Sequence, residues 1–308
     1  MSSMRFRIVA TVFISAALVG LGGAWLLTTP RPQFGPSNPF PRTGGNAERG
    51  RDVFNAADCA SCHATPGQPD RLKLGGGLAL ASPFGTFRPP NISPDPVDGI
   101  GSWGVSDFAN ALVTGVSPDG RHYYPAFPYT SYTGMTAADI NDLFAYLKSL
   151  PPVAGRAPPH HPSILFAIRR SVGLWKLLFF DPAQPQPGSE VAAFGIERGR
   201  YIVEALSHCA ECHSTRNIFG AIKSTARFAG GIDPQGTGFV PNITPVGIGG
   251  WTEERIARML ETGDTPTHGR VGSSMADVVS NTAMLSDEDR KAIAKYIKSL
   301  PARPTPEP

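Results

Sequence analysis

The sequence has few cysteines, few charged residues and no run of lysine or arginine. Only four cysteines occur in 308 residues, too few for a fold held together by disulfides, so their spacing must show what they do. Charged residues make up 17% of the chain and the formal net charge is +3, which does not indicate a nucleic-acid-binding protein. With 34 glycines and 31 prolines, the composition indicates a loop-rich globular protein of two domains.

Charge is also absent from a long stretch near the N-terminus. Residues 8–27 contain no charged side chain and follow Arg5 and Arg7, and this length is sufficient to cross the hydrocarbon core of a bilayer. Basic residues on the short leading side keep that side cytoplasmic and send the rest of the chain across. A cleaved secretory signal is the alternative, but its apolar region is usually shorter and ends in small residues. Trp25 and two leucines close this one, so we expect a retained transmembrane anchor.

The chain contains one unit twice. The matching segments are residues 48–51 and 197–200, 59–63 and 209–213, 90–94 and 241–245, and 146–151 and 296–301. Two copies indicate a duplicated domain rather than a solenoid, which needs more repeats to bury its faces. The predicted boundaries are 1–30 for the anchor or signal, 31–44 for a linker, 45–152 for the first domain, 153–194 for a second linker, 195–303 for the second domain and 304–308 for a tail.

Each copy is predicted to contain three helices joined by long loops. They span about residues 46–57, 106–113 and 136–150 in the first copy, and about 195–206, 252–261 and 286–298 in the second. In the third helix, apolar residues recur at helical spacing between Ile140 and Leu150, and Thr136 with Asp139 matches an N-terminal capping box. We find no convincing strand pair, so the expected fold class is mainly α.

The linker 153–194 is rich in proline and carries an apolar stretch from Ile164 to Phe180. This stretch would expose a large apolar patch if it stood alone, so we expect it to pack against one or both domains. Contact with a membrane surface or with a partner protein is the alternative.

All four cysteines belong to two CxxCH motifs. In this spacing the two thiols add to the vinyl groups of a haem and the following histidine binds the iron. We predict two covalently bound haem c groups, attached to Cys59, Cys62, Cys209 and Cys212, with His63 and His213 as iron ligands. A four-cysteine zinc site would leave both histidines unexplained, and a thioredoxin-like redox pair would need a βαβ context that is absent.

A sixth iron ligand must come from elsewhere in each copy. In the second copy, Met275 lies in the loop before the last helix and is the expected ligand, because Met259 and Met284 occupy packing positions. In the first copy the corresponding loop carries Phe127, which cannot bind iron.

Met135 is the only thioether left for the first haem, and we take it as the candidate ligand. The same position also suits a hydrophobic residue that packs on Ile140 in front of the last helix. In that case either His122 binds the iron or the iron stays open. A methionine ligand would close the site for electron transfer, whereas an open distal face would bind a small molecule.

Both copies resemble class I cytochrome c domains. Residues 42–303 resemble dihaem cytochromes c related to the cytochrome subunits of bacterial membrane-bound alcohol and gluconate-type dehydrogenases. The resemblance rests on ERGR before each CxxCH, the PNIS and PNIT loops, YYPAFPYTSY before the third helix and RRSVGLWKLLFF in the linker. Those subunits typically carry three haem domains and a methionine in a PAMPY motif, whereas this chain has two domains and Phe127.

The resemblance implies two tandem class I cytochrome c domains behind a transmembrane helix, at the bacterial inner membrane with the haem domains in the periplasm. It implies electron transfer from a periplasmic or membrane-bound dehydrogenase to a terminal oxidase, a quinone-linked complex or a soluble cytochrome. No separate nucleophile, acid-base pair or nucleotide loop is found, so redox chemistry of the haems is the expected function. A dihaem peroxidase or an oxidoreductase for a small sulfur compound, with an open first haem, is the alternative.

Overall fold

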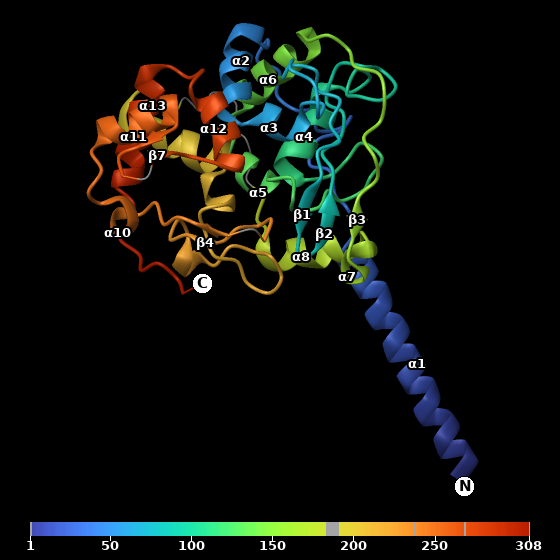
Figure 1. The fold of residues 1–308 in the computed structure, drawn as a ribbon. Coiled ribbons are helices and arrows are strands. Elements are labelled where there is room, and N and C mark those ends of the chain that lie inside the picture. Colours follow the sequence, from blue (N-terminus) through green and yellow to red (C-terminus); the bar gives the residue numbers. More distant parts are fainter. Residues whose placement is uncertain (1, 183–190, 237, 268, 308) are drawn as a thin grey trace.

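The computed structural model describes residues 2–182, 191–236, 238–267 and 269–307, so residues 183–190 of the predicted second linker lie outside the described residues. Helix α1 (Ser2–Leu27) projects from the folded body, as Figure 1 shows. Its segment Phe6–Leu27 is long and apolar enough to cross a membrane, and the most apolar part of that segment has no residue buried against the rest of the chain. Length and composition are equally compatible with a signal sequence, because an N-terminal signal has the same features.

Each repeat forms a helical unit, and the predicted mainly α class is confirmed. The first unit contains α2 (Ala47–Ala56), α3 (Cys59–His63), α4 (Val105–Thr114), α5 (Tyr129–Tyr132) and α6 (Ala137–Ser149). The second contains α9 (Gly195–Tyr201), a π-helical turn (Ile202–Leu206), two 3₁₀ turns (Cys209–Glu211 and Ser224–Ala226), α10 (Pro245–Ile248), α11 (Glu253–Thr262), α12 (Ser274–Thr282) and α13 (Asp287–Lys298). Half of the predicted capping box is present. Thr136 Oγ1 accepts from the backbone N–H of Asp139 at 3.1 Å, but the N–H of Thr136 donates to Tyr201 Oη and not to Asp139.

The expectation that no strands pair was wrong. In the part of the chain that the structure describes there are three small antiparallel sheets: β1 (Leu80–Ser82) with β2 (Gly85–Phe87) and β3 (His161–Pro162), β4 (Gly231–Ile232) with β5 (Phe239–Val240), and β6 (Asp264–Thr265) with β7 (Gly269–Arg270). Strands of two or three residues are too short to produce an alternating apolar pattern, so periodicity could not reveal them.

The first and last helices of each unit cross at a glycine. A Cβ on Gly50 would lie 1.9 Å from the carbonyl oxygen of Asp142, and one on Gly199 would lie 1.9 Å from that of Ala292. An arginine beside each glycine forms an ion pair across the same crossing, Arg49 with Asp142 and Arg198 with Asp289, both at 2.7 Å. The repeated ERGR segment is therefore the crossing point of α2 with α6 and of α9 with α13.

The two units share one hydrophobic core. The π-helical turn of the second unit contacts α2 and α5 of the first, and α12 contacts α2 and α3. Polar contacts cross the same boundary: Ser207 Oγ donates to the carbonyl oxygen of Ala56 at 2.8 Å, and the N–H of Thr136 donates to Tyr201 Oη at 3.0 Å. The two units therefore pack directly on each other.

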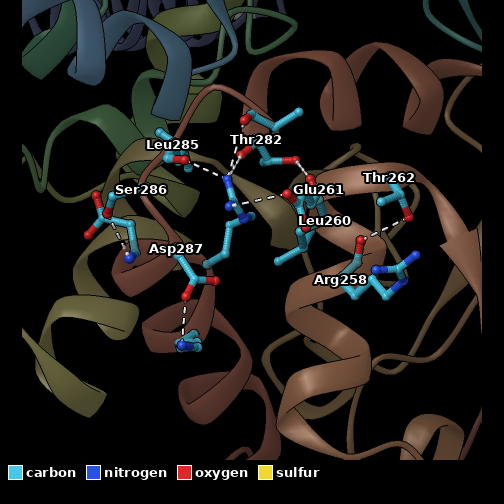
Figure 2. A network of polar contacts seen from close by, with 12 residues as sticks. Arg258, Leu260, Glu261, Thr262, Thr282, Leu285, Ser286 and Asp287 are labelled. Carbon is cyan, nitrogen blue, oxygen red and sulfur yellow. Dashed lines mark hydrogen bonds and ion pairs between the residues drawn. The ribbon is translucent and has the colours of Figure 1, made fainter.

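Helix α12 is held in place by polar contacts with α11 and α13. Thr282 Oγ1 donates to the carbonyl oxygen of Leu260 at 2.5 Å. The buried guanidinium of Arg290 donates to the carbonyl oxygen of Thr282 at 3.5 Å, and to that of Leu285 in the segment after α12. Figure 2 shows this group of side chains between the helices. Because α12 also contacts the first unit, these contacts fix the boundary between the units.

The linker packs against both units, as predicted. It forms α7 (Ile164–Ala167) and α8 (Ser171–Phe179). The indole N–H of Trp175 donates to the carbonyl oxygen of Phe219 in the second unit at 2.9 Å. Lys176 Nζ donates to the carbonyl oxygens of Thr114 and Gly115 in the first unit, both at 2.7 Å. Helix α8 thus joins the two units from outside the core.

The close helix crossings at Gly50 and Gly199 predict that replacing either glycine by alanine destabilises its unit. Gly199→Ala should lower the free energy of unfolding by about 1–3 kcal/mol, because the added Cβ forces two backbones apart. Thermal unfolding of the haem-loaded protein measures the change. Gly250→Ala is the control, since a Cβ there meets nothing within 4 Å, and an equal effect of the two substitutions would contradict the crossing argument.

The partly buried His160 predicts a pH-dependent stability. Its Nδ1 accepts from the N–H of Arg88 at 3.0 Å, and burial lowers the pKa of this imidazole to about 4. As the pH falls from about 6.5, the unfolded chain binds a proton that the folded chain does not, so the free energy of unfolding decreases toward pH 4. His160→Asn keeps an oxygen acceptor and should reduce this decrease in denaturant titrations. A decrease of the same size in His160→Asn as in the parent would contradict the assignment to His160.

Candidate haem-binding sites

The first CxxCH motif forms the helical turn α3, the second begins in a 3₁₀ turn over Cys209–Glu211, and the chain enters each through a left-handed residue. Asp58 has φ 56° and His208 has φ 43°, and both directly precede the first cysteine of their motif. Non-glycine residues rarely adopt this conformation, and such strain concentrates at functional sites. In one turn, the two cysteines three positions apart lie on the same side of the chain.

The four cysteine side chains are all described, and none of them forms a disulfide. Burial raises the pKa of the Cys62 and Cys209 thiols to about 12 and that of Cys212 to about 11, and it also raises the pKa of Cys59. Among the described residues, no group of three or more histidine, cysteine or acidic side chains is placed to bind a metal ion.

Both motif histidines are oriented by a backbone carbonyl. His63 Nδ1 lies 2.8 Å from the carbonyl oxygen of Pro90, and His213 Nδ1 lies 2.8 Å from that of Pro241. A carbonyl only accepts, so Nδ1 carries the proton and Nε2 keeps the lone pair that binds a metal. Burial lowers the pKa of His63 to about 4 and also lowers that of His213, so both rings are neutral at neutral pH.

The loops that supply these carbonyls are held by their asparagines. Asn91 Nδ2 donates to the carbonyl oxygens of Val153 and Gly155 at 2.6 and 3.0 Å. In the second unit, Asn242 Nδ2 donates to the carbonyl oxygen of Arg303 at 2.9 Å. Sequence reasoning missed this positioning role, although the repetition of Pro-Asn-Ile was the signal for it.

The surroundings of both motifs are apolar and repeat between the units. The apolar side chains that pack against the core beside the motifs include Ile92 and Trp103 in the first unit, and Ile243 and Trp251 in the second. Arg88, in the first unit, has a buried Nε without a hydrogen-bond partner. A haem has apolar faces and two carboxylates, so an apolar wall with a free buried guanidinium N–H fits this group. Arg121 and Arg270, two further candidates for the carboxylates, already pair with Asp119 and Asp264.

The candidate distal ligands lie in different surroundings. Met275 was expected in a loop, but it lies in the first turn of α12, partly buried against the core. Met135 is only 1% exposed and lies in the core next to Ile140, which suits both a ligand and a packing residue. Met284 was expected to pack, but it is 65% exposed.

The structure also shows what Phe127 and His122, in the distal loop of the first unit, contact. The ring of Phe127 lies against Tyr123 and Tyr132, with centroid distances of 5.5 and 5.7 Å. His122 Nε2 lies 2.9 Å from the carbonyl oxygen of Thr28, at the end of α1. That contact leaves Nδ1 as the free nitrogen, and it is buried without a hydrogen-bond partner. His122 therefore stays the alternative to Met135, which we keep as the predicted ligand.

Both motifs lie at the boundary between the units. Asn281 Nδ2, on α12, donates to Ser61 Oγ inside the first motif at 2.9 Å. The rings of Tyr132 and His208 lie 5.8 Å apart, and Thr130 Oγ1 donates to Glu211 Oε1 inside the second motif at 2.7 Å. Each motif is thus contacted by side chains of the other unit.

Comparisons with known proteins agree with these observations. Residues 47–151 and 196–301 match the family model for cytochrome c. The chain is similar to a "Diheme cytochrome c-type" protein of Cereibacter sphaeroides, with 46% identity over 92% of this chain and 95% of the relative. It is also similar to a nicotinate dehydrogenase subunit of Pseudomonas putida, with 40% identity over 83% of this chain and 21% of the relative.

A third relative is the fructose dehydrogenase cytochrome subunit of Gluconobacter japonicus, with 36% identity over 87% of this chain and 56% of the relative. The chain therefore spans nearly the whole length of the dihaem relative, but only about a fifth and about half of these two dehydrogenase subunits. The family match covers both repeats, and each repeat contains one CxxCH motif. The chain thus belongs to the cytochrome c family and carries two covalently bound haem c groups.

Proposed function

We propose that this protein is a membrane-anchored cytochrome that moves electrons through the periplasm, from a dehydrogenase to a respiratory acceptor. The acceptor would be a terminal oxidase, a quinone-linked complex or a soluble cytochrome. The observation that carries the proposal is that each CxxCH motif is contacted by a side chain of the other unit, Ser61 by Asn281 and Glu211 by Thr130. Each haem iron supplies one-electron chemistry, and motifs that meet at one boundary allow transfer between the two sites without a domain movement.

We assign the haem-holding residues by motif. Cys59, Cys62, Cys209 and Cys212 form the thioether bonds, His63 and His213 bind the two irons, and Met275 and Met135 are the sixth ligands. The carbonyl oxygens of Pro90 and Pro241 fix the imidazole planes through the Nδ1 protons and make Nε2 a stronger donor. Residues 45–152 and 195–303 form the two haem domains in this assignment.

The anchor in this proposal is α1. Its segment Phe6–Leu27 has the length and apolar composition of a membrane span, and Arg5 and Arg7 place its leading end in the cytoplasm. The two units that follow then lie in the periplasm, where a dehydrogenase can reach them. Relatives of this chain include subunits named for nicotinate and fructose dehydrogenases, which supports a dehydrogenase as the electron donor.

The ligand assignment predicts how the reduced protein responds to carbon monoxide. The parent should show no change in its haem absorption bands, because a firmly bound methionine closes each iron. Met135→Leu retains the packing volume but removes the thioether, so it should bind carbon monoxide at one of the two haems. The midpoint potential of that haem should fall as well, because methionine ligation raises it.

Met259→Leu is the matched control, since this partly buried methionine lies on α11 in the second unit. It should leave both haems closed. Carbon monoxide binding by the parent at half of its haem would contradict Met135 as a ligand. That result would favour the peroxidase or sulfur-compound alternative with an open first haem.

The anchor predicts that the mature protein remains in the membrane. After expression with haem attachment, the protein should stay in the membrane fraction through washes with high salt and alkaline carbonate. Its intact mass should include α1, because the segment is retained. A soluble periplasmic product that begins after Leu27 would show instead that the segment is a cleaved signal.

A further inference from the structure

Helix α8 and the turn before it expose a row of aliphatic side chains. Ile164 is 93% exposed, Ile168 70%, Leu174 54%, Leu177 54% and Leu178 63%. The three leucines follow a spacing of three and four residues, so they lie on one face of the helix. We call these five side chains the α8 patch. A group of neighbouring exposed aliphatic side chains marks an interaction surface.

The opposite face of α8 already fixes the helix to the body. Val172 and Trp175 are 1% and 8% exposed, and the hydrogen bonds of Trp175 and Lys176 reach both units. Folding of the linker therefore does not require leucines on the outer face. Their exposure needs another explanation, namely a surface that covers them.

The position of the α8 patch beside α1 indicates which surface covers it. Arg170 Nη2 donates to the carbonyl oxygen of Trp25 at 2.5 Å and to Thr29 Oγ1 at 2.7 Å, and its guanidinium lies 3.6 Å from the centre of the Trp25 ring. A Cβ on Gly173 would lie 2.5 Å from the carbonyl oxygen of Thr28. Helix α8 is therefore in direct contact with the last turn of α1. Figure 1 shows α7 and α8 on the side of the body from which α1 departs.

We propose that the α8 patch inserts into the surface of the phospholipid bilayer that α1 crosses. This inference rests on the proposed membrane anchor. When α1 spans the bilayer, Trp25 lies near its outer end, at the depth where tryptophan is enriched, and the contact with Arg170 and Gly173 brings α8 to the same level. Leucine and isoleucine side chains enter the boundary between headgroups and acyl chains in interfacial helices of this kind.

Charge at the edge of the patch fits a phospholipid surface. Arg169, next to Ile168, is partly exposed, and its guanidinium lies 4.5 Å from the centre of the Tyr124 ring. A basic residue beside an apolar helix face can bind lipid phosphate while the apolar side chains insert. With α1 and α8 both at the membrane, the two haem units are held in one orientation rather than on a flexible tether.

The test places a fluorescent probe at single positions of the full-length, haem-loaded protein. The four native cysteines are consumed by the haems, so an introduced cysteine is the only thiol that the NBD probe can label. Leu177→Cys reports on the patch and Val12→Cys reports on α1. Met284→Cys is the matched control, because Met284 is also an exposed apolar residue and lies between α12 and α13, far from α1 in Figure 1.

The labelled proteins are reconstituted in phosphatidylethanolamine and phosphatidylglycerol vesicles without any partner protein. Nitroxide-labelled lipid should quench the probes at Leu177→Cys and Val12→Cys several times more strongly than the probe at Met284→Cys. Iodide in the buffer should quench only the probe at Met284→Cys. Leu174→Cys lies on the same helix face and replaces Leu177→Cys if that variant does not take up haem.

The experiment distinguishes failure of the membrane contact of the α8 patch from failure of the membrane anchor α1. Lipid quenching at Val12→Cys together with iodide quenching at Leu177→Cys would leave the anchor standing and overturn the membrane contact of the patch, as expected if a protein partner covers it instead. Iodide quenching at both positions would overturn the anchor and the inference together.

A second measurement tests whether the leucines themselves cause the contact. The probe at Ile168→Cys is compared with and without the added changes Leu174→Ser, Leu177→Ser and Leu178→Ser. Lipid quenching should fall to the level of the Met284→Cys control, while the haem absorption spectrum stays the same. Unchanged lipid quenching would show that the leucine face does not insert, and would contradict the proposal.

Discussion

The hydrogen bond between each motif histidine and the carbonyl of the Pro-Asn-Ile loop is the contact on which both sites depend. It sets the tautomer and the plane of the ring that is to bind iron. The carbonyl is held by its own loop, and the loop is held by Asn91 or Asn242. These asparagines bind backbone that follows the last helix of their unit, at Val153 and at Arg303. The ends of each repeat therefore take part in orienting a histidine near its beginning.

The duplication explains why this scaffold repeats so closely while the distal loops differ. Glycine crossings, cross-helix ion pairs and asparagine-held loops occur once in each unit, because every one of them serves the same CxxCH motif. The segments before the last helices, around α5 and α12, differ from this scaffold because both also contact the other unit. Met135, between α5 and α6, and Met275, at the start of α12, lie in these segments. Because the two segments contact different neighbours, the two copies need not match there.

Much of this architecture could be predicted from the sequence, because many of its features depend on residues that are close together in the chain. One or two helical turns are enough to define the cap at Thr136, the helical spacing from Ile140 to Leu150 and the CxxCH motifs. The positioning of His63 depends on Pro90 and Val153, which are distant in sequence, so no local pattern could show it. The strands were missed because they contain two or three residues. The place of Met275 was missed because α12 depends on Arg290 and Leu260 from neighbouring helices, not on a strong helical pattern of its own.

Helix α8 connects the anchor to both haem units, and the connection is stiff for a physical reason. Its lysine lies at the C-terminal end of α4, where the carbonyl oxygens of Thr114 and Gly115 point out of the helix and favour a cation. The ring of Tyr129, 4.6 Å from Lys176 Nζ, adds a second attraction to the same ammonium group. Burial lowers the pKa of Lys176 to about 7, but the amine donates to both carbonyl oxygens in either protonation state, and buried hydrogen bonds are costly to break. Helix α8 therefore follows the first unit as one body, and Trp175 extends this body to the second unit. The end of α1 contacts the same helix through Arg170, so the orientation of the anchor also fixes the orientation of both CxxCH motifs.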